Sequence, residues 1–318
     1  MIRPSASYIA MKKLRILASL TTHDNDYQRE QAASLESGAR KLGVDLQIVY
    51  ANNDAINQSQ QLLKVIQGPA DARPDAIMLE PVGTGLPQVA KAAVAVGIGW
   101  VVMNRDVDYL TELRRSAKMP VFGLSSDHNE VGRIQGRQFG ILTEPGQCVL
   151  YIEGPTVSDA SRYRTSGMNT TKPPEIEVKT LKGSWTETSA YNAVSSWLKL
   201  STSRNLPVGV VGCQNDAMAI GARRAFQELT KDADRERWLR LPFTGCDGLP
   251  GTGQTYVRRG SLTATVVIPA LGGHALEMLV KAVQTGSLPP ERTLTVPSSY
   301  PSLEELKSNS KKSMAVKA

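Results

Sequence analysis

Residues 208–226, VGVVGCQNDAMAIGARRAF, most constrain the fold, because a short apolar run changes there into helical periodicity. The three valines of the run are β-branched and suit a buried strand. Asp216 is expected to be the N-cap of the helix that follows. The next apolar positions recur at helical spacing: Met218, Ala222, Ala225 and Leu229. A strand that ends in polar side chains where a helix begins forms the ligand crevices of α/β proteins, so functional residues are expected at strand ends.

The same alternation of apolar runs and helical periodicity recurs along most of the chain. Expected strands are 14–20, 46–50, 76–79, 100–103, 148–152, 176–181, 208–213, 243–246 and 262–267. Expected helices include 32–42, 56–66, 89–96, 129–142, 158–169, 187–199, 216–229 and 271–285, followed by an extended Pro-rich tail. Repeated β-α units demand parallel sheets covered on both faces. With 318 residues, the predicted fold is α/β with two doubly wound parallel-sheet lobes.

The domain boundaries follow from the two series of strands. Residues 1–13 are predicted to be an N-terminal extension and residues 307–318 a basic tail. The N-terminal lobe is expected to hold 14–126 plus about 269–293, and the C-terminal lobe 127–268 plus about 294–306. Since no Ser/Gly-rich linker separates the series, several short strand crossings should join the lobes and act as a hinge.

The charge distribution argues against a nucleic-acid partner. The formal net charge is +7, but eight Lys and Arg residues lie before the first acidic residue or after the last one. The part between is therefore nearly neutral and offers no phosphate-binding face. No stretch approaches the roughly 18 apolar residues of a membrane span.

Catalytic and metal-binding motifs are not evident. The three cysteines lie in apolar contexts and are expected to be buried, and the three histidines have no metal-ligand spacing. The chain has no GxxxxGK[ST] phosphate loop, no GxSxG elbow and no HExxH helix. We therefore expect no metal, no cofactor and no enzymatic activity. An enzyme nevertheless remains an alternative, because strand-end carboxylates can do acid–base chemistry.

Polar side chains follow most of the expected strands. They are residues 22–26, Glu80, Asn104 with Arg105, Asp127, Asn215 with Asp216, and Asp247. The carboxyl ends of parallel strands meet at one edge of a sheet, so these groups should converge on a crevice. Amides, carboxylates and guanidiniums donate and accept hydrogen bonds in pairs, which suits a neutral polyol better than a phosphate. Taken singly, each Asn or Asp is better explained as a turn former or helix cap, and it is the collective pattern that favours a site.

These features resemble the type I periplasmic sugar-binding proteins, the ribose and galactose binders of ABC transporters, over residues 14–306. The resemblance is carried by the order of elements, the Gln214-Asn215-Asp216 segment, the Gly245–Gly248 turn, the Asn104-Arg105 pair and the Gly154/Arg162/Arg164/Gly167 spacing. It implies a protein that captures a sugar or polyol between two lobes by hinge closure, delivers it to a membrane permease or receptor, and acts as a monomer.

The resemblance also implies a periplasmic or cell-envelope location. No export signal is visible, because the apolar run 16–20 is shorter than a signal-peptide core and is better explained as the first strand. A cytoplasmic location thus stays open. The alternative function is a stand-alone cytoplasmic or sensory ligand-binding protein that feeds a kinase or regulator, and the third is a sugar-modifying enzyme.

The family resemblance implies nine ligand-binding residues. They are Asn25, Tyr27, Gln28, Asn104, Arg105, Arg162, Trp185, Asn215 and Asp247. Aromatic rings can cover the C–H faces of a sugar while arginine, amide and carboxylate groups bind its hydroxyls. Gln28 stands where ribose binders carry an aromatic, Asn104 replaces an Asp, and Ile268 stands near the second hinge crossing in place of a glutamine. The ligand is therefore not expected to be ribose.

Overall fold

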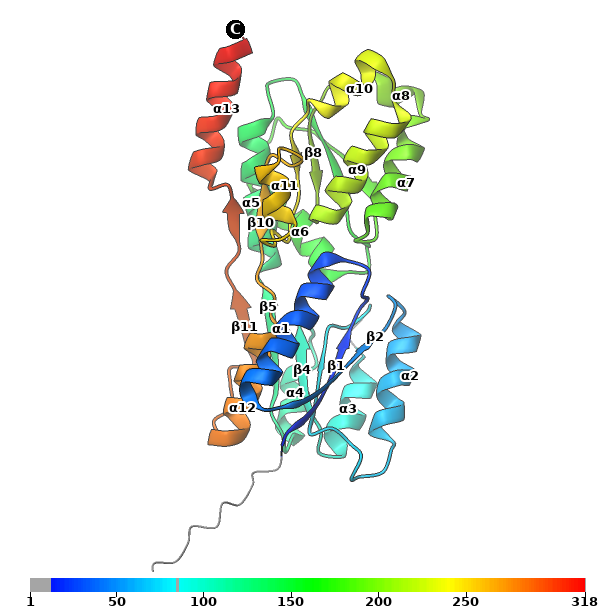
Figure 1. The fold of residues 1–318 in the computed structure, drawn as a ribbon, viewed down its shortest axis with the longest axis vertical. Helices are drawn as coiled ribbons and strands as arrows, with labels where there is room; N and C mark the ends of the chain where they lie inside the picture. The colour runs from blue at the N-terminus through cyan, green and yellow to red at the C-terminus, as the bar shows by residue number, and fades with distance from the viewer. Residues whose placement is uncertain (1–12, 84–85, 318) are drawn as a thin grey trace, which may run out of the picture.

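The chain folds into two α/β lobes, which lie one above the other in Figure 1. The structure is a computed structural model and describes residues 13–83 and 86–317. The predicted extension, residues 1–13, lies outside the described part except for Lys13. Two parallel sheets with helices on both faces confirm the predicted fold class. Within the described residues, no helix is both long and apolar enough to cross a bilayer.

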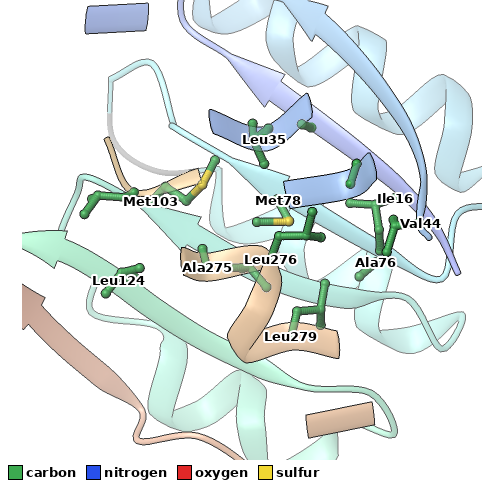
Figure 2. Close-up of a cluster of buried hydrophobic side chains, with 14 of the residues drawn as sticks. Ile16, Leu35, Val44, Ala76, Met78, Met103, Leu124, Ala275, Leu276 and Leu279 are labelled. Atoms are coloured by element: carbon green, nitrogen blue, oxygen red, sulfur yellow. The ribbon is translucent and has the colours of Figure 1, made fainter. Parts of the chain in front are cut away.

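The N-terminal lobe is built on a six-stranded parallel sheet with the order β11-β5-β4-β3-β1-β2. Its strands are β1 (Arg15–Leu20), β2 (Asp45–Tyr50), β3 (Ala76–Leu79), β4 (Gly99–Met103), β5 (Val121–Ser126) and β11 (Arg292–Thr295). One face packs against α1 (Asp26–Leu42) and α12 (Gly272–Thr285), as Figure 2 shows for Leu35, Leu276 and Leu279 around Met78. The other face packs against α2 (Ala55–Ile66), α3 (Pro87–Ala95) and α4 (Leu110–Ser116).

The C-terminal lobe has a four-stranded parallel sheet with the order β7-β6-β8-β9. These strands are β6 (Cys148–Glu153), β7 (Val178–Lys182), β8 (Val208–Cys213) and β9 (Phe243–Thr244). One face packs against α7 (Glu187–Leu198), α9 (Asp216–Leu229) and α10 (Asp232–Leu239), and the other against α5 (His128–Leu142) and α6 (Asp159–Thr171). The short helices α8 (Ser201–Arg204) and α11 (Gly253–Arg258) complete the lobe. All three cysteines are buried and free, as predicted.

Three segments cross between the lobes. The first leads from β5 into α5 at Asp127, and the second leads from β10 (Thr265–Val267) into α12. The third joins β11 to β12 (Ser298–Tyr300), which pairs antiparallel with β10. The long strip formed by β11 and the segment after it runs from one lobe to the other in Figure 1.

Several local predictions differ from the structure. The Pro-rich segment after α12 is extended, as predicted, and contains β11 and β12, but a helix follows it: α13 (Leu303–Lys317) packs beside α5 and includes residues 307–317 of the predicted basic tail. A capping box begins it, because Ser302 Oγ accepts from Glu305 N at 3.2 Å while Glu305 Oε2 accepts from Ser302 N at 3.0 Å. β11 runs whole in the N-terminal sheet, so residues 294 and 295 belong there and not to the C-terminal lobe.

Candidate functional site

A cavity of about 310 Å3 lies between the lobes, at the carboxyl ends of their strands. Residues that follow β1, β3 and β4 line one side, and residues that follow β6, β7, β8 and β9 line the other. This is the edge at which α/β sheets bind ligands. Eight of the nine predicted residues line it: Asn25, Tyr27, Gln28, Asn104, Arg105, Trp185, Asn215 and Asp247.

Arg162 does not line the cavity, so its predicted position was wrong. Its side chain is 65% exposed and forms an ion pair with Asp159 one helical turn earlier. Arg164 lines the cavity instead and is only 3% exposed. At 3.6 residues per turn, two residues correspond to a rotation of about 200° around α6, so the two arginines face opposite ways.

The position of Arg164 is set by a close crossing of α5 and α6. A Cβ added at Gly132 would lie 2.0 Å from the Arg164 carbonyl oxygen, and one added at Gly167 would lie 2.0 Å from the Asn129 carbonyl oxygen. Only glycine allows the two helix backbones to approach so closely. The crossing therefore fixes the backbone of Arg164 against the first turn of α5.

The guanidinium of Arg164 is held from several sides but is not saturated. Nη1 donates to the Gln214 carbonyl oxygen, and Nη2 lies 3.5 Å from His128 Nδ1. The group stacks over Trp185, with 5.4 Å between its central carbon and the ring centroid. Its Nε is buried and donates to no hydrogen-bond acceptor among the described residues. A buried charged N–H thus lacks an acceptor in a residue that lines the cavity.

Glu80, which was expected at the crevice but not among the nine ligand-binding residues, organises the opposite wall. Its carboxylate accepts from Gln28 Nε2 at 2.8 Å and from Asn104 Nδ2 at 2.9 Å, and Arg105 Nη1 lies 3.6 Å from Glu80 Oε1. Because a carboxylate only accepts, it turns the amide nitrogen of Asn104 toward itself. The Asn104 Oδ1 atom is then left buried with no donor from the described residues. The available signal was the position of Glu80 directly after β3.

Asn215, not Asp216, is the N-cap of α9, which corrects the sequence prediction. Asn215 Oδ1 accepts from Met218 N at 2.9 Å, and its Nδ2 donates to the Trp185 carbonyl oxygen at 2.9 Å. The Trp185 ring also lies against Gly154, where an added Cβ would come within 2.3 Å of it. Asn215 therefore lines the cavity while holding the tryptophan loop in place.

Four non-glycine residues that line the cavity have left-handed backbone conformations. The φ angles of Asn53, Asn104, Trp185 and Asp247 are 57°, 55°, 67° and 107°. Such conformations cost non-glycine residues about 1–3 kcal/mol each and concentrate at binding sites. Each of these residues follows the end of a strand directly or after a turn of a few residues. The strand ends therefore direct these side chains to the cavity, and the backbone is strained there.

Tyr27 joins the two lobes. It begins α1 of the N-terminal lobe, but it is buried among Val131, Val266 and other apolar residues of the C-terminal side. Its hydroxyl donates to the Pro269 carbonyl oxygen in the second crossing at 3.2 Å. Ile268 is buried in the same cluster and does not line the cavity. Ile268 therefore packs in the same apolar cluster as Tyr27, outside the lining of the cavity.

Asp216 and Asp247 form a buried carboxyl pair at the base of the C-terminal wall. Asp216 accepts from Thr265 Oγ1 at 2.6 Å and from Gly248 N at 2.8 Å. Burial raises the pKa of Asp216 to about 7, although these hydrogen bonds oppose the shift. Burial, and then the charge of Asp216, raise the pKa of Asp247 well above its ordinary value. Together the two carboxyls carry less negative charge than two exposed ones.

The pair predicts a pH-dependent stability. A carboxyl whose pKa is higher in the folded than in the unfolded chain stabilises the fold below an ordinary pKa of about 3.9, and this contribution is lost as the pH rises through about 7. The Asp216→Asn variant should therefore gain at least about 1 kcal/mol relative to wild type between pH 5 and pH 7.5. Urea unfolding of both proteins at the two pH values measures this difference, in which titrating groups that do not interact with Asp216 cancel; the pKa of Asp247 falls in the variant and changes the difference in the same direction. A constant difference would contradict the raised pKa.

No metal centre is evident in the described ranges, where no group of three or more His, Cys, Asp and Glu side chains is placed to hold an ion.

Comparison with known proteins places the chain in a family. The family described as periplasmic binding protein domain matches residues 16–287. A putative rhizopine-binding protein of Rhizobium meliloti is 29% identical over 227 residues, which cover 68% of this chain and 69% of that protein. The D-apiose import binding protein of Paraburkholderia graminis is 26% identical and covers 88% of this chain and 85% of its own length.

A solved structure shares the fold. The periplasmic binding protein component of the arabinose ABC transporter from Shewanella sp. ANA-3, bound to α- and β-L-arabinofuranose, has a TM-score of 0.76 at 23% identity and covers 94% of this chain and 95% of its own. The family match spans both lobes and the residues of the cavity from Thr21 to Asp247. The chain therefore belongs to the periplasmic binding protein family, in agreement with its resemblance to the type I sugar-binding members.

Proposed function

We propose that the protein captures a small neutral sugar or polyol in the cavity between its lobes and delivers it to the permease of an ABC transporter. One observation carries this proposal: residues lining the cavity hold three buried polar atoms that have no hydrogen-bond partner among the described residues. These are Asn104 Oδ1, Ser158 Oγ and Arg164 Nε. Asn104 Oδ1 is an acceptor, Ser158 Oγ is a hydroxyl that can donate or accept a hydrogen bond, and Arg164 Nε is a charged donor. Adjacent hydroxyl groups of a polyol match such a set, because each can donate and accept.

The charges of the cavity support a neutral ligand. Arg105 and Arg164 line it together with Glu80 and Asp247, so two cations face two carboxyls. Glu80 is occupied by the amides of Gln28 and Asn104, and the raised pKa of Asp247 reduces its negative charge. An anionic ligand would meet these carboxyls, and a cationic one would meet the arginines. A hydroxyl can hydrogen-bond to either kind of group.

The size and walls of the cavity support a ligand of monosaccharide size. A volume of about 310 Å3 lies at the lower end of the roughly 300–1,000 Å3 that small-molecule sites span. Trp185 and Tyr27 provide aromatic surface from opposite lobes for the C–H faces of the ligand. The names of the relatives, which include D-apiose and arabinose binders, favour the same chemical class.

The placement of the cavity between the lobes supports delivery to a permease. Only contacts from both lobes can favour a closed conformation, because a ligand shifts an equilibrium by its differential affinity for the two states. The ligand-closed shape is then the form that a membrane partner recognises. We propose that this occurs in the periplasm, with the protein as a monomer and with no chemical change to the ligand.

A ligand screen with a conformational readout tests the proposal. Thermal shifts with pentoses, hexoses, inositols and small furanoses should identify one class that raises the melting temperature, since a ligand that binds only the folded state stabilises it. Small-angle scattering with that ligand at saturation should show a smaller or more compact particle if an open form is populated without it. If no member of the panel stabilises the protein while amino acids or phosphates do, the assignment to sugars is wrong.

A further inference from the structure

We infer that His128 is a positioning residue that orients the Arg164 guanidinium for the ligand and connects it to Asn104 of the other lobe. This inference rests on the proposed function, because it assigns a role within the same binding site. His128 begins α5, directly after the first crossing between the lobes, and it is 5% exposed. It does not line the ligand cavity itself, so it acts through the residues that do.

The two ring nitrogens of His128 have different partners. Nδ1 lies 3.5 Å from Arg164 Nη2, and Nε2 lies 3.3 Å from the Asn104 carbonyl oxygen. A guanidinium can only donate and a carbonyl oxygen can only accept. These contacts therefore select the neutral tautomer that carries its proton on Nε2. Burial and the nearby charges of Arg164 and Arg105 hold the pKa of His128 well below its usual range, which favours this neutral form.

His128 links hydrogen-bond networks of the two lobes. On the N-terminal side, the Asn104 carbonyl oxygen also accepts from Arg105 Nη1 at 2.9 Å, and the Asn104 amide donates to Glu80. On the C-terminal side, Arg164 donates to the Gln214 carbonyl oxygen and stacks on Trp185. The imidazole is the group that contacts both networks. Ligand-facing residues of the two lobes are thus joined behind the cavity by one side chain.

This arrangement fixes the orientation of the Arg164 guanidinium at the cavity wall. A planar guanidinium has a fixed set of donor directions, so two fixed acceptors determine the direction of the rest. Gln214 and His128 supply those acceptors on Nη1 and Nη2. If the acceptor at His128 is removed, the buried N–H of Arg164 Nη2 loses its partner. Rotation of the guanidinium toward another acceptor then becomes favourable. Ligand affinity should then fall although no residue of the cavity wall has changed.

Two substitutions separate the contacts of His128. In His128→Asn the amide oxygen can take the place of Nδ1 and accept from Arg164, whereas in His128→Gln the amide nitrogen can take the place of Nε2 and donate to the Asn104 carbonyl. His128→Leu removes both. Calorimetry with L-arabinose and D-apiose as probes should give His128→Asn within about threefold of wild-type affinity, and His128→Gln and His128→Leu at least tenfold weaker. The melting temperatures of the Asn and Gln variants should be similar.

A second measurement needs no ligand and keeps a failure of this inference distinct from a failure of the proposed function. Nitrogen-15 NMR of the ligand-free protein near pH 7 should show the His128 proton on Nε2. The Arg164 Nε–H signal should keep its position in His128→Asn and shift in His128→Gln. An Nδ1-protonated ring, or an Arg164 signal that is the same in all variants, overturns the positioning role even if neither probe binds. Equal losses of affinity in the Asn and Gln variants, in step with lower melting temperatures, would also overturn it.

Discussion

Replacing Arg164 by methionine should weaken ligand binding by about 1.5–3 kcal/mol, which is roughly ten- to hundredfold in the dissociation constant. The guanidinium lines the cavity, is almost fully buried, and holds a free Nε–H among the described residues. A hydrogen bond from a charged donor in such a site is stronger than one between neutral groups. Methionine keeps an apolar stem of similar length but removes the charge, every donor and the guanidinium that stacks on Trp185. Calorimetry with the ligand identified by the screen measures the loss.

Arg162→Met is the matched control for this experiment. Arg162 lies on the same helix two residues earlier, but its exposed side chain pairs only with Asp159 in the described structure. Exposed ion pairs contribute about 0–1 kcal/mol, so both affinity and stability should stay close to those of wild type. A loss of affinity at position 162 that equals or exceeds the loss at position 164 would contradict the placement of α6.

The largest loss of stability is expected for Gly132→Ala. The new Cβ would lie 2.0 Å from the Arg164 carbonyl oxygen and 2.8 Å from Met168 N, which are backbone atoms that cannot rotate away. The helices α5 and α6 would have to move apart, at a cost of about 1–3 kcal/mol or more for an overpacked contact. Since the crossing positions Arg164 against His128, ligand affinity should decrease with stability. Urea unfolding followed by circular dichroism gives the change in free energy.

Gly251→Ala provides the control for the glycine substitution. Gly251 lies in a turn after β9, and an added Cβ would meet no atom within 4 Å. The same chemical change should therefore leave the free energy of unfolding within about 0.5 kcal/mol of the wild-type value, as for most surface substitutions. If the two alanine variants unfold at the same urea concentration, the close crossing of α5 and α6 is not important for stability.

The alternation of strands and helices could be predicted because it depends on local periodicity. Residues 208–213 and 216–229 were predicted with the bounds that β8 and α9 have. Short elements such as α4, α8, α10 and α11 were missed, since they contain too few apolar positions to show a period. The α13 helix was missed because its composition is polar, although the Ser302-Glu305 capping box was a usable signal.

The site was predictable to the level of strand ends but not to the level of a helix face. Strand ends in a parallel sheet converge whatever the details of packing, so Asn104, Asn215 and Asp247 were found from position alone. Arg162 was chosen over Arg164 because sequence spacing does not state which face of a helix points to a cleft. The buried stripe of α6, which includes Ala160, Arg164 and Gly167 at spacings of four and three, would have identified Arg164 as the arginine that faces the cavity.

The three crossings between the lobes also set an order on synthesis at the ribosome. The N-terminal sheet obtains its edge strand β11 only after Thr295 has emerged, and β12 pairs with β10 only after Tyr300. The N-terminal sheet must therefore wait, with β5 as its edge strand, and β10 must wait without its partner β12, until residues 292–300 leave the exit tunnel. Unpaired strand edges are sites of aggregation. A nascent chain stalled before residue 292 should thus depend on chaperones more than the released protein does.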